Sequence, residues 1–239
     1  MKKFDINQKL GDIAAEFPKA AELFREYKID YCCGGNRALI EAIEEGNLNG
    51  QEIVDKLNDL YNEYASKNEL ERNWQEAPLN ELVDHILNKH HAYLWAELPN
   101  ISELTTKILR AHGTNHPEIS KVHKLFHNLK MELESHLVKE EAQQYPAIRK
   151  YEESKVKNDL DEAIRVIMEL EDEHTGAGDI LKKLRKITDD YTVPDDGCPT
   201  YKQTYDKLQE LESDMFEHIH LENNILFPRL FNLTNNSMR

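Results

Sequence analysis

Two segments of the chain repeat one pattern of residue types, and this repeat constrains the fold more than any other feature. Each has a histidine, a glutamate four residues later, an aromatic residue nine later and a proline ten later; the segments are His136–Pro146 and His218–Pro228. No other histidine is followed by glutamate at the fourth position. Four residues of an α-helix turn through about 400°, so the histidine and glutamate of each segment share one helix face.

Two further histidines are spaced regularly against this repeat. His91 precedes His136 by 45 residues, and His174 precedes His218 by 44 residues. We therefore expect two helix pairs, each with a lone histidine on its first helix and a His-x-x-x-Glu motif on its second. Packed with pseudo-twofold symmetry, the helices bring four imidazoles and two carboxylates, those of Glu140 and Glu222, to the centre of a bundle. From spacing alone, His85 stays an alternative to His91.

These six side chains suit a metal centre, because an unpaired ionised glutamate on a buried helix face is costly. Imidazole and carboxylate ligands without thiolate favour iron or manganese over structural zinc. Two ions that share six side chains keep coordination positions open for a small ligand such as O2 or NO. The alternative is a bundle whose core histidines make only hydrogen bonds and buried ion pairs.

Helical periodicity runs through most of the chain, which has only nine glycines and eight prolines. We expect four long helical stretches: 79–98 with a continuation after Pro99 to residue 110, then 117–141, 158–191 and 200–232. Short connections between such stretches predict an antiparallel four-helix bundle in an all-α protein. The predicted domains are a small helical unit over 1–65, a linker over 66–77, and the bundle over 78–239.

Charge and hydropathy exclude several classes of partner. Lys and Arg total 30 and Asp and Glu total 45, which makes the formal net charge −15. Phosphate backbones repel such a chain, so we expect no nucleic-acid partner. We expect no membrane span and no signal peptide, because no long apolar run is present. Three cysteines are too few for a disulfide framework, which favours a reducing cytoplasm.

Two of these cysteines, Cys32 and Cys33, are adjacent in a turn between helical segments, and two glycines follow them. Proximity to a helix N-terminus predicts that both thiols are more acidic than free cysteine. The equally weighted alternative is a helix-joining turn with two small buried cysteines. Cys198 lies in a loop rich in proline and glycine and has no predicted role.

The other histidines are predicted to lie outside the centre. Helix geometry turns several of them away from the ligand face, so they are expected to be surface or flanking groups: His85, His90, His123, His127 and His220. His112 and His116 fall in a predicted loop, where a role in turn structure is expected.

Taken together, the motifs resemble one known family, the iron–sulfur cluster repair di-iron proteins, also called repair of iron centres (RIC) proteins. Residues 29–35, Ile-Asp-Tyr-Cys-Cys-Gly-Gly, resemble the signature of that family's short N-terminal domain. The remainder resembles its haemerythrin-like domain through His91, His136-x-x-x-Glu140, Asp172-Glu173-His174 and His218-x-x-x-Glu222-Asn223-Asn224. One departure is Gln143-Gln144-Tyr145-Pro146, where the family pattern has a more apolar run that ends in Phe-Pro. It affects the expected packing beyond Glu140 and leaves the ligands unchanged.

The resemblance implies a centre of two non-haem iron ions bridged by Glu140 and Glu222. It implies a cytoplasmic stress protein, expected to be a homodimer, that restores iron–sulfur clusters damaged by nitric oxide or oxidants. Acidic residues that line a route to the irons in that family match Glu132 and Glu173 here. Iron donation and nitric oxide reduction both stay open as mechanisms, so enzymatic activity is undecided.

Two other functions compete with repair. A haemerythrin-type carrier or sensor of O2 or NO would use the same ligands, but it has no need of the Cys32-Cys33 unit. A ferritin-like oxidase uses Glu-x-x-His twice, with two further glutamates as ligands. The spacing occurs at Glu171-x-x-His174 and at Glu217-x-x-His220, but of these histidines only His174 is a predicted ligand. The oxidase is therefore the weakest of the three hypotheses.

Overall fold

The computed structural model of the chain describes residues 3–67 and 72–236. Within these ranges it consists of helices and turns without a strand, apart from an isolated bridge between Lys9 and Ala38. The expected all-α fold class is thus confirmed. None of the helices in the described ranges is long and apolar enough to cross a membrane.

The chain divides into two compact units. One comprises Met1–Leu82 together with Phe216–Arg239, and the other comprises Val83–Met215. Two helices contribute residues to both units; they are α5 (Leu79–Ile86) and α10 (Pro199–His220). The predicted linker begins within helix α4, which extends to Lys67, and its residues 68–71 lie outside the described part of the chain.

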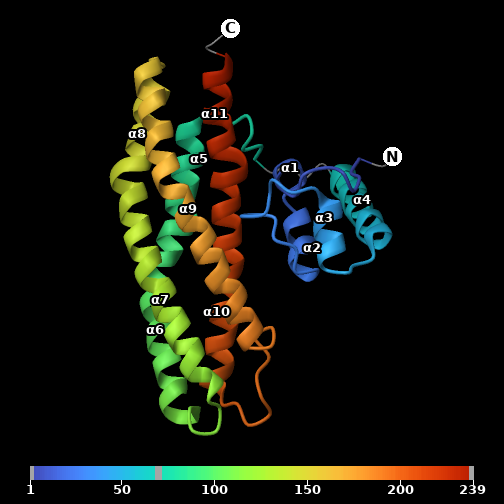
Figure 1. Ribbon diagram of the computed structural model, residues 1–239, viewed down its shortest axis with the longest axis vertical. Helices are drawn as coiled ribbons and strands as arrows, with labels where there is room; N and C mark the ends of the chain where they lie inside the picture. Colours follow the sequence, from blue (N-terminus) through green and yellow to red (C-terminus); the bar gives the residue numbers. More distant parts are fainter. Residues whose placement is uncertain (1–2, 68–71, 237–239) are drawn as a thin grey trace. The chain divides into compact units, whose positions relative to one another are not determined.

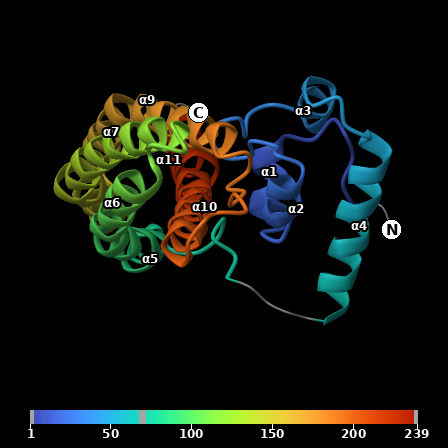
Figure 2. The same cartoon turned by 90° about the horizontal axis from the view of Figure 1, so that it is seen from below.

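Three helical columns make up most of the Val83–Met215 unit. They are α6 (Ala92–His112), α7 (Glu118–Lys139) with its continuation α8 (Tyr145–Ser154), and α9 (Lys157–Ile187). Helix α7 packs against both α6 and α9, and α8 packs against α9. Figure 1 shows α6, α7 and α9 from the side, and Figure 2 views them nearly end-on.

Apolar residues at helical spacing explain why these columns pack. The buried stripe of α7 is Ile119, Val122, Phe126, Leu129, Leu133 and Leu137. On α6 the buried stripe includes Leu94, Leu98, Ile101 and Ile108. Spacings of three and four residues place such side chains on one face, where burial stabilises the unit by about 25 cal/mol per Å² of apolar surface.

Proline does not interrupt the helices where the sequence suggested breaks. Helix α6 passes through Pro99 without a stop, although that residue lacks a backbone donor. Leu98 and Ile101 are fully buried on either side, and their packing holds the helix together. The second stretch also extends beyond the predicted end at residue 141, to Ser154. Pro146 lies in the first turn of α8, where a missing N–H costs little.

Three π-helical turns interrupt the long helices, and each contains a predicted ligand. Segment η1 (Leu87–His91) ends at His91, η2 (Glu140–Gln144) begins at Glu140, and η3 (Leu221–Leu226) contains Glu222. A π turn inserts an extra residue into an α-helix and is often found at functional sites. These insertions were not predicted from the sequence, because they leave the three- and four-residue periodicity on either side unchanged.

The other unit is built from short helices in the N-terminal part and from the C-terminal end of the chain. Its helices are α1 (Leu10–Glu16), α2 (Ala20–Glu26), α3 (Leu39–Glu45), α4 (Gly50–Lys67), η3 and α11 (Phe227–Asn236). Phe4, Phe17 and Tyr61 form an aromatic cluster with ring centroids 5.2–6.2 Å apart. Helix α1 packs against η3, so the N-terminal part is joined to the segment that carries Glu222.

Candidate metal centre

Three imidazoles surround the carboxylate of Glu140 within the Val83–Met215 unit. The Nε2 atoms of His91, His136 and His174 lie 3.2, 3.0 and 3.7 Å from its oxygens. The Nε2 atoms of His136 and His174 are 2.9 Å apart. All four side chains are buried, with Glu140 completely so. A carboxylate and three imidazole nitrogens therefore converge in a space without solvent.

The environment of Glu140 fits a bound cation. Burial raises the pKa of this carboxyl, but the imidazoles of His136, His174 and His91 lower it more, so the pKa lies well below its ordinary value. The group is therefore ionised, and neither oxygen accepts a hydrogen bond of good geometry. A buried anion of this kind must be neutralised by protons on the imidazoles or by metal ions.

Two further carboxylates hold the outer nitrogens of the histidines. Glu141 Oε1 lies 2.9 Å from His91 Nδ1, and Glu173 Oε2 lies 2.7 Å from His136 Nδ1. Burial raises the pKa of both carboxyls, yet their hydrogen-bond partners lower both pKa values overall. An ionised carboxylate at Nδ1 keeps the proton there and leaves the Nε2 lone pair for a metal, as in carboxylate–histidine–metal triads.

Neighbouring donors fix these two carboxylates in turn. Trp95 Nε1 donates to Glu141 at 2.9 Å, and Lys139 Nζ pairs with Glu173 at 2.5 Å. Side chains of α6 and α7 therefore orient the imidazoles before any ion binds.

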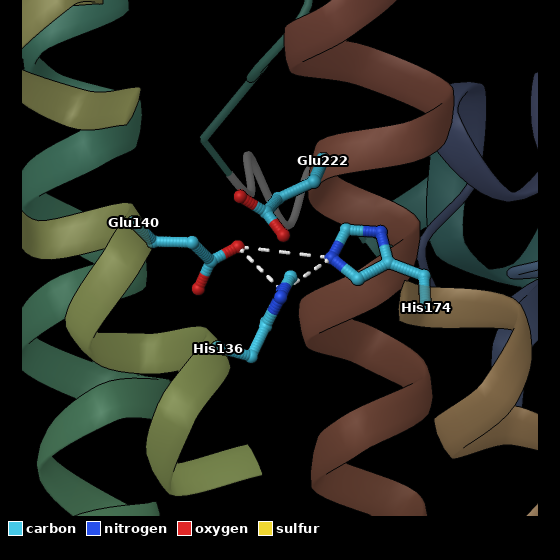
Figure 3. A group of neighbouring side chains, drawn as sticks. All are labelled: His136, Glu140, His174 and Glu222. Atoms are coloured by element: carbon cyan, nitrogen blue, oxygen red, sulfur yellow. Dashed lines mark hydrogen bonds and ion pairs between the residues drawn. The ribbon is translucent and has the colours of Figure 1, made fainter. Parts of the chain in front are cut away.

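The second half of the repeat lies on α10 and η3. His218 Nε2 is 3.5 Å from Glu222 Oε2, and both side chains are buried. Figure 3 draws Glu222 with His136, Glu140 and His174; each of the four offers one ligand atom within 4.8 Å of the others. A second group of possible ligands consists of His91, Glu140 and His218. Glu140 belongs to both groups.

The six predicted ligands are thus all buried, whereas the alternative His85 is half-buried and packs against His90. Of the acidic residues expected to line a route to the metals, Glu173 contacts His136 directly. Glu132 is exposed on α7, and no possible ligand group includes it.

Two of the histidines expected to be surface or flanking groups are buried. His90 is completely buried, with its Nδ1 2.8 Å from Asp214 Oδ1. His220 packs its ring on Tyr31, and burial lowers its pKa to about 4. Neither is therefore a surface group. The expectation came from the angular position of each histidine on an ideal α-helix. It does not include the π turn that contains His90, nor the packing of Tyr31 on His220.

The cysteine turn is organised by Asp30. Its Oδ1 accepts hydrogen bonds from the backbone N–H groups of Cys32, Cys33 and Gly34 at 3.0–3.2 Å. Cys32 Sγ also lies 3.3 Å from this oxygen. Burial raises the pKa of the Cys32 thiol well above its ordinary value, and Cys33 and Asp30 raise it further. The prediction that the thiol is more acidic than free cysteine was therefore wrong for Cys32. The Cys33 side chain, in contrast to the buried Cys32, is partly exposed.

Asn224, two residues after Glu222, holds this turn. Its Nδ2 lies 3.2 and 3.0 Å from the carbonyl oxygens of Tyr31 and Cys32, and 3.1 Å from His220 Nδ1. The cysteine turn is thereby tied to the π turn that carries a predicted ligand. Sequence reasoning missed this contact, although the resemblance included Asn224.

Cys198, expected to have no role, lies beside a histidine. Its Sγ is 3.2 Å from His112 Nε2, and this contact lowers the pKa of the thiol.

Two family models match the chain. The model described as ScdA_N, a domain of unknown function (DUF542), matches residues 6–61. The hemerythrin HHE cation binding domain matches residues 82–230, which include all six predicted ligands.

Curated relatives match along almost the whole chain. The iron-sulfur cluster repair protein ScdA of Staphylococcus haemolyticus is 30% identical over 92% of this chain and 96% of its own length. The iron-sulfur cluster repair proteins YtfE of Citrobacter koseri and of Escherichia coli O157:H7 are each 36% identical over 93% of this chain and 96% of their own length.

Proposed function

Because the chain belongs to the family of iron–sulfur cluster repair proteins that join an ScdA_N domain to a hemerythrin HHE domain, we propose that it repairs damaged iron–sulfur clusters by means of a non-haem di-iron centre. The observation that carries the proposal is the match of both domains, in order, to curated repair proteins. A haemerythrin-type carrier would account for the second domain alone. We therefore favour repair after oxidative or nitrosative damage.

The proposed centre holds two iron ions. His136 and His174 would bind one ion, and His91 and His218 would bind the other. Glu140 belongs to both groups of possible ligands, which supports a bridging role, and Glu222 is its counterpart in the repeat. The donor set of four imidazoles and two carboxylates suits iron. Bound iron would supply electrons and open coordination positions for NO or O2, or would itself be donated to a damaged cluster.

Residues around the ligands prepare the site. Glu141 and Glu173 lie against the outer nitrogens of His91 and His136, and protons kept there would leave both inner nitrogens available to an ion. Glu173 is also partly exposed, and its position between Lys139 and His136 supports a role on the route by which small ligands or iron reach the centre. Glu132 would act further out on that route, because its side chain is exposed.

We assign the cysteine turn to activity rather than to iron binding. All six proposed ligands lie beyond residue 90, whereas Cys32 and Cys33 lie in the N-terminal segment. Their Sγ atoms are 3.8 Å apart, and only Cys33 is partly exposed. Cys33 would therefore make the first contact with a client cluster or an exchanging thiol. The proposal further includes a cytoplasmic homodimer, and the mass of the purified protein in solution tests the dimer.

The test uses the full chain loaded anaerobically with iron. Iron content and a Mössbauer spectrum should show an antiferromagnetically coupled pair. A purified enzyme whose [4Fe–4S] cluster has been damaged by nitric oxide should regain activity with this protein. The double variant Cys32→Ser/Cys33→Ser should keep both irons and lose repair, while the control Cys198→Ser should keep both properties.

Two results would count against the proposal. Absence of a coupled iron pair would refute the di-iron centre. Full repair by the double variant would leave Cys32 and Cys33 as a structural turn only.

A further inference from the structure

Tyr145 brings an additional oxygen atom to the proposed centre. It is the first residue of α8 and follows directly after the π turn η2 that begins at Glu140. Its side chain is 1% exposed, and its hydroxyl oxygen lies 3.2 Å from His91 Nε2. The hydroxyl group therefore lies beside an atom that is itself proposed to bind iron.

The inner nitrogen of His91 lies between two oxygen atoms. Its Nε2 is 3.2 Å from the Tyr145 hydroxyl and 3.2 Å from Glu140 Oε2, while its Nδ1 lies 2.9 Å from Glu141. An ion bound at Nε2 would use the lone pair of this nitrogen, and the Tyr145 oxygen is placed beside that ion.

The distances fit direct binding of the phenol oxygen to that ion. Two donor atoms about 2.1 Å from one ion and at right angles to each other lie about 3.0 Å apart. His91 Nε2 is 3.2 Å from the Tyr145 oxygen and also 3.2 Å from Glu140 Oε2. The phenol oxygen is therefore as close to the nitrogen ligand as the carboxylate ligand is.

We propose that Tyr145 is a seventh protein ligand, whose phenolate oxygen binds the ferric form of the iron held by His91. This inference rests on the proposed di-iron centre. On binding, the O–H bond of Tyr145 is replaced by an iron–oxygen bond, and the proton leaves to solvent; no electron is transferred in this step. A phenolate is a hard, negatively charged donor, so it stabilises the ferric ion more than the ferrous one.

The internal repeat makes the two iron positions unequal. Phe227 occupies the place in the second segment that Tyr145 occupies in the first, and it is equally buried. Phe227 has no oxygen to offer, so only the iron of His91 gains the extra ligand. The family pattern that the sequence resembles led us to expect phenylalanine at residue 145 as well.

Optical and vibrational spectra of the iron-loaded full chain test the assignment. The chain is loaded anaerobically, its iron is measured, and it is then oxidised with ferricyanide. We expect a visible phenolate-to-iron charge-transfer band, and resonance Raman excitation within it should show tyrosinate ring modes. Tyr145→Phe removes one oxygen atom and should abolish band and ring modes while the iron content stays unchanged. Tyr205→Phe also removes a buried hydroxyl, which is bonded to Tyr201, and should leave both signals intact.

The possible results separate this inference from the function on which it rests. Coupled iron without tyrosinate modes would overturn the role of Tyr145 and leave the di-iron centre in place. Tyrosinate modes that persist in Tyr145→Phe would likewise overturn it. Failure of the unaltered chain to bind iron would overturn both proposals together.

Discussion

Substitution of Gly35 by alanine tests how the cysteine turn is joined to the segment that carries Glu222. A Cβ atom at Gly35 would lie 2.1 Å from Asn224 Oδ1 and 2.7 Å from its Cγ, far inside van der Waals contact. No glycine in the described ranges has a positive φ, so alanine meets no backbone strain at this position. The whole cost of Gly35→Ala should therefore come from displacing the side chain of Asn224.

The magnitude follows from the contacts that Asn224 would lose. The two hydrogens of its Nδ2 group are shared among Tyr31 O, Cys32 O and His220 Nδ1. Each hydrogen bond contributes about 1 kcal/mol, so their loss costs about 2 kcal/mol. Alanine at residue 35 recovers about 0.4–1 kcal/mol because it restricts the unfolded chain. We expect Gly35→Ala to destabilise the protein by about 1–1.5 kcal/mol, and Asn224→Ala by about 2 kcal/mol.

A double-mutant cycle isolates the contact. The three atoms nearest to the added Cβ all belong to the amide group of Asn224, which alanine at residue 224 lacks. In the Asn224→Ala background, Gly35→Ala should therefore cost nothing or stabilise slightly. The assay is urea unfolding of the metal-free chain followed by circular dichroism, since bound metal would add stability by mass action. The m-values of all variants should agree.

Gly176 supplies the control for this cycle. It lies within α9, and nothing lies within 4 Å of an added Cβ. Gly176→Ala should stabilise the protein by about 0.5–1 kcal/mol through helix propensity. Additive costs for Gly35→Ala and Asn224→Ala, or no cost for Gly35→Ala alone, would refute the clash argument.

Three further predictions concern the metal centre, the third cysteine and the domain organisation. Glu140→Ala should lower the iron content more than Glu222→Ala, because Glu140 belongs to both groups of possible ligands; elemental analysis and Mössbauer spectra measure this. The lowered pKa of Cys198 means more thiolate at neutral pH than an ordinary thiol has, so iodoacetamide should alkylate it faster below pH 9, and His112→Ala should slow the reaction. A fragment over 78–239 should fold and bind two irons per chain, and a folded fragment without iron would show that the N-terminal unit helps to form the site.

Much of the fold and of the candidate centre was accessible from the sequence, because helical periodicity is a local property. The spacing of four residues between His136 and Glu140 places both on one face whatever the rest of the chain does. Leu129, seven residues before His136, lies on the same helix face and indicates that this face is buried, and Glu140 is completely buried in the structure. The 44- and 45-residue spacings then related His91 and His174 to the repeat.

Other properties depend on contacts between segments far apart in sequence, and only the tertiary structure decided them. Cys32 has a raised pKa chiefly because the surrounding core excludes water from its thiol, and Cys33 and Asp30 raise the pKa further. These effects outweigh any nearby helix dipole. His220 is buried because the N-terminal segment places Tyr31 on it.

The π turns show most clearly the difference between what the local sequence pattern determines and what tertiary packing determines. An inserted residue leaves the hydrophobic pattern on both sides intact, so no local signal marked η2 at Glu140. That insertion and the packing around it place the hydroxyl of Tyr145 3.2 Å from His91. The sequence determined which residue types face the interior; the packing of helices from distant parts of the chain determined which of their atoms meet.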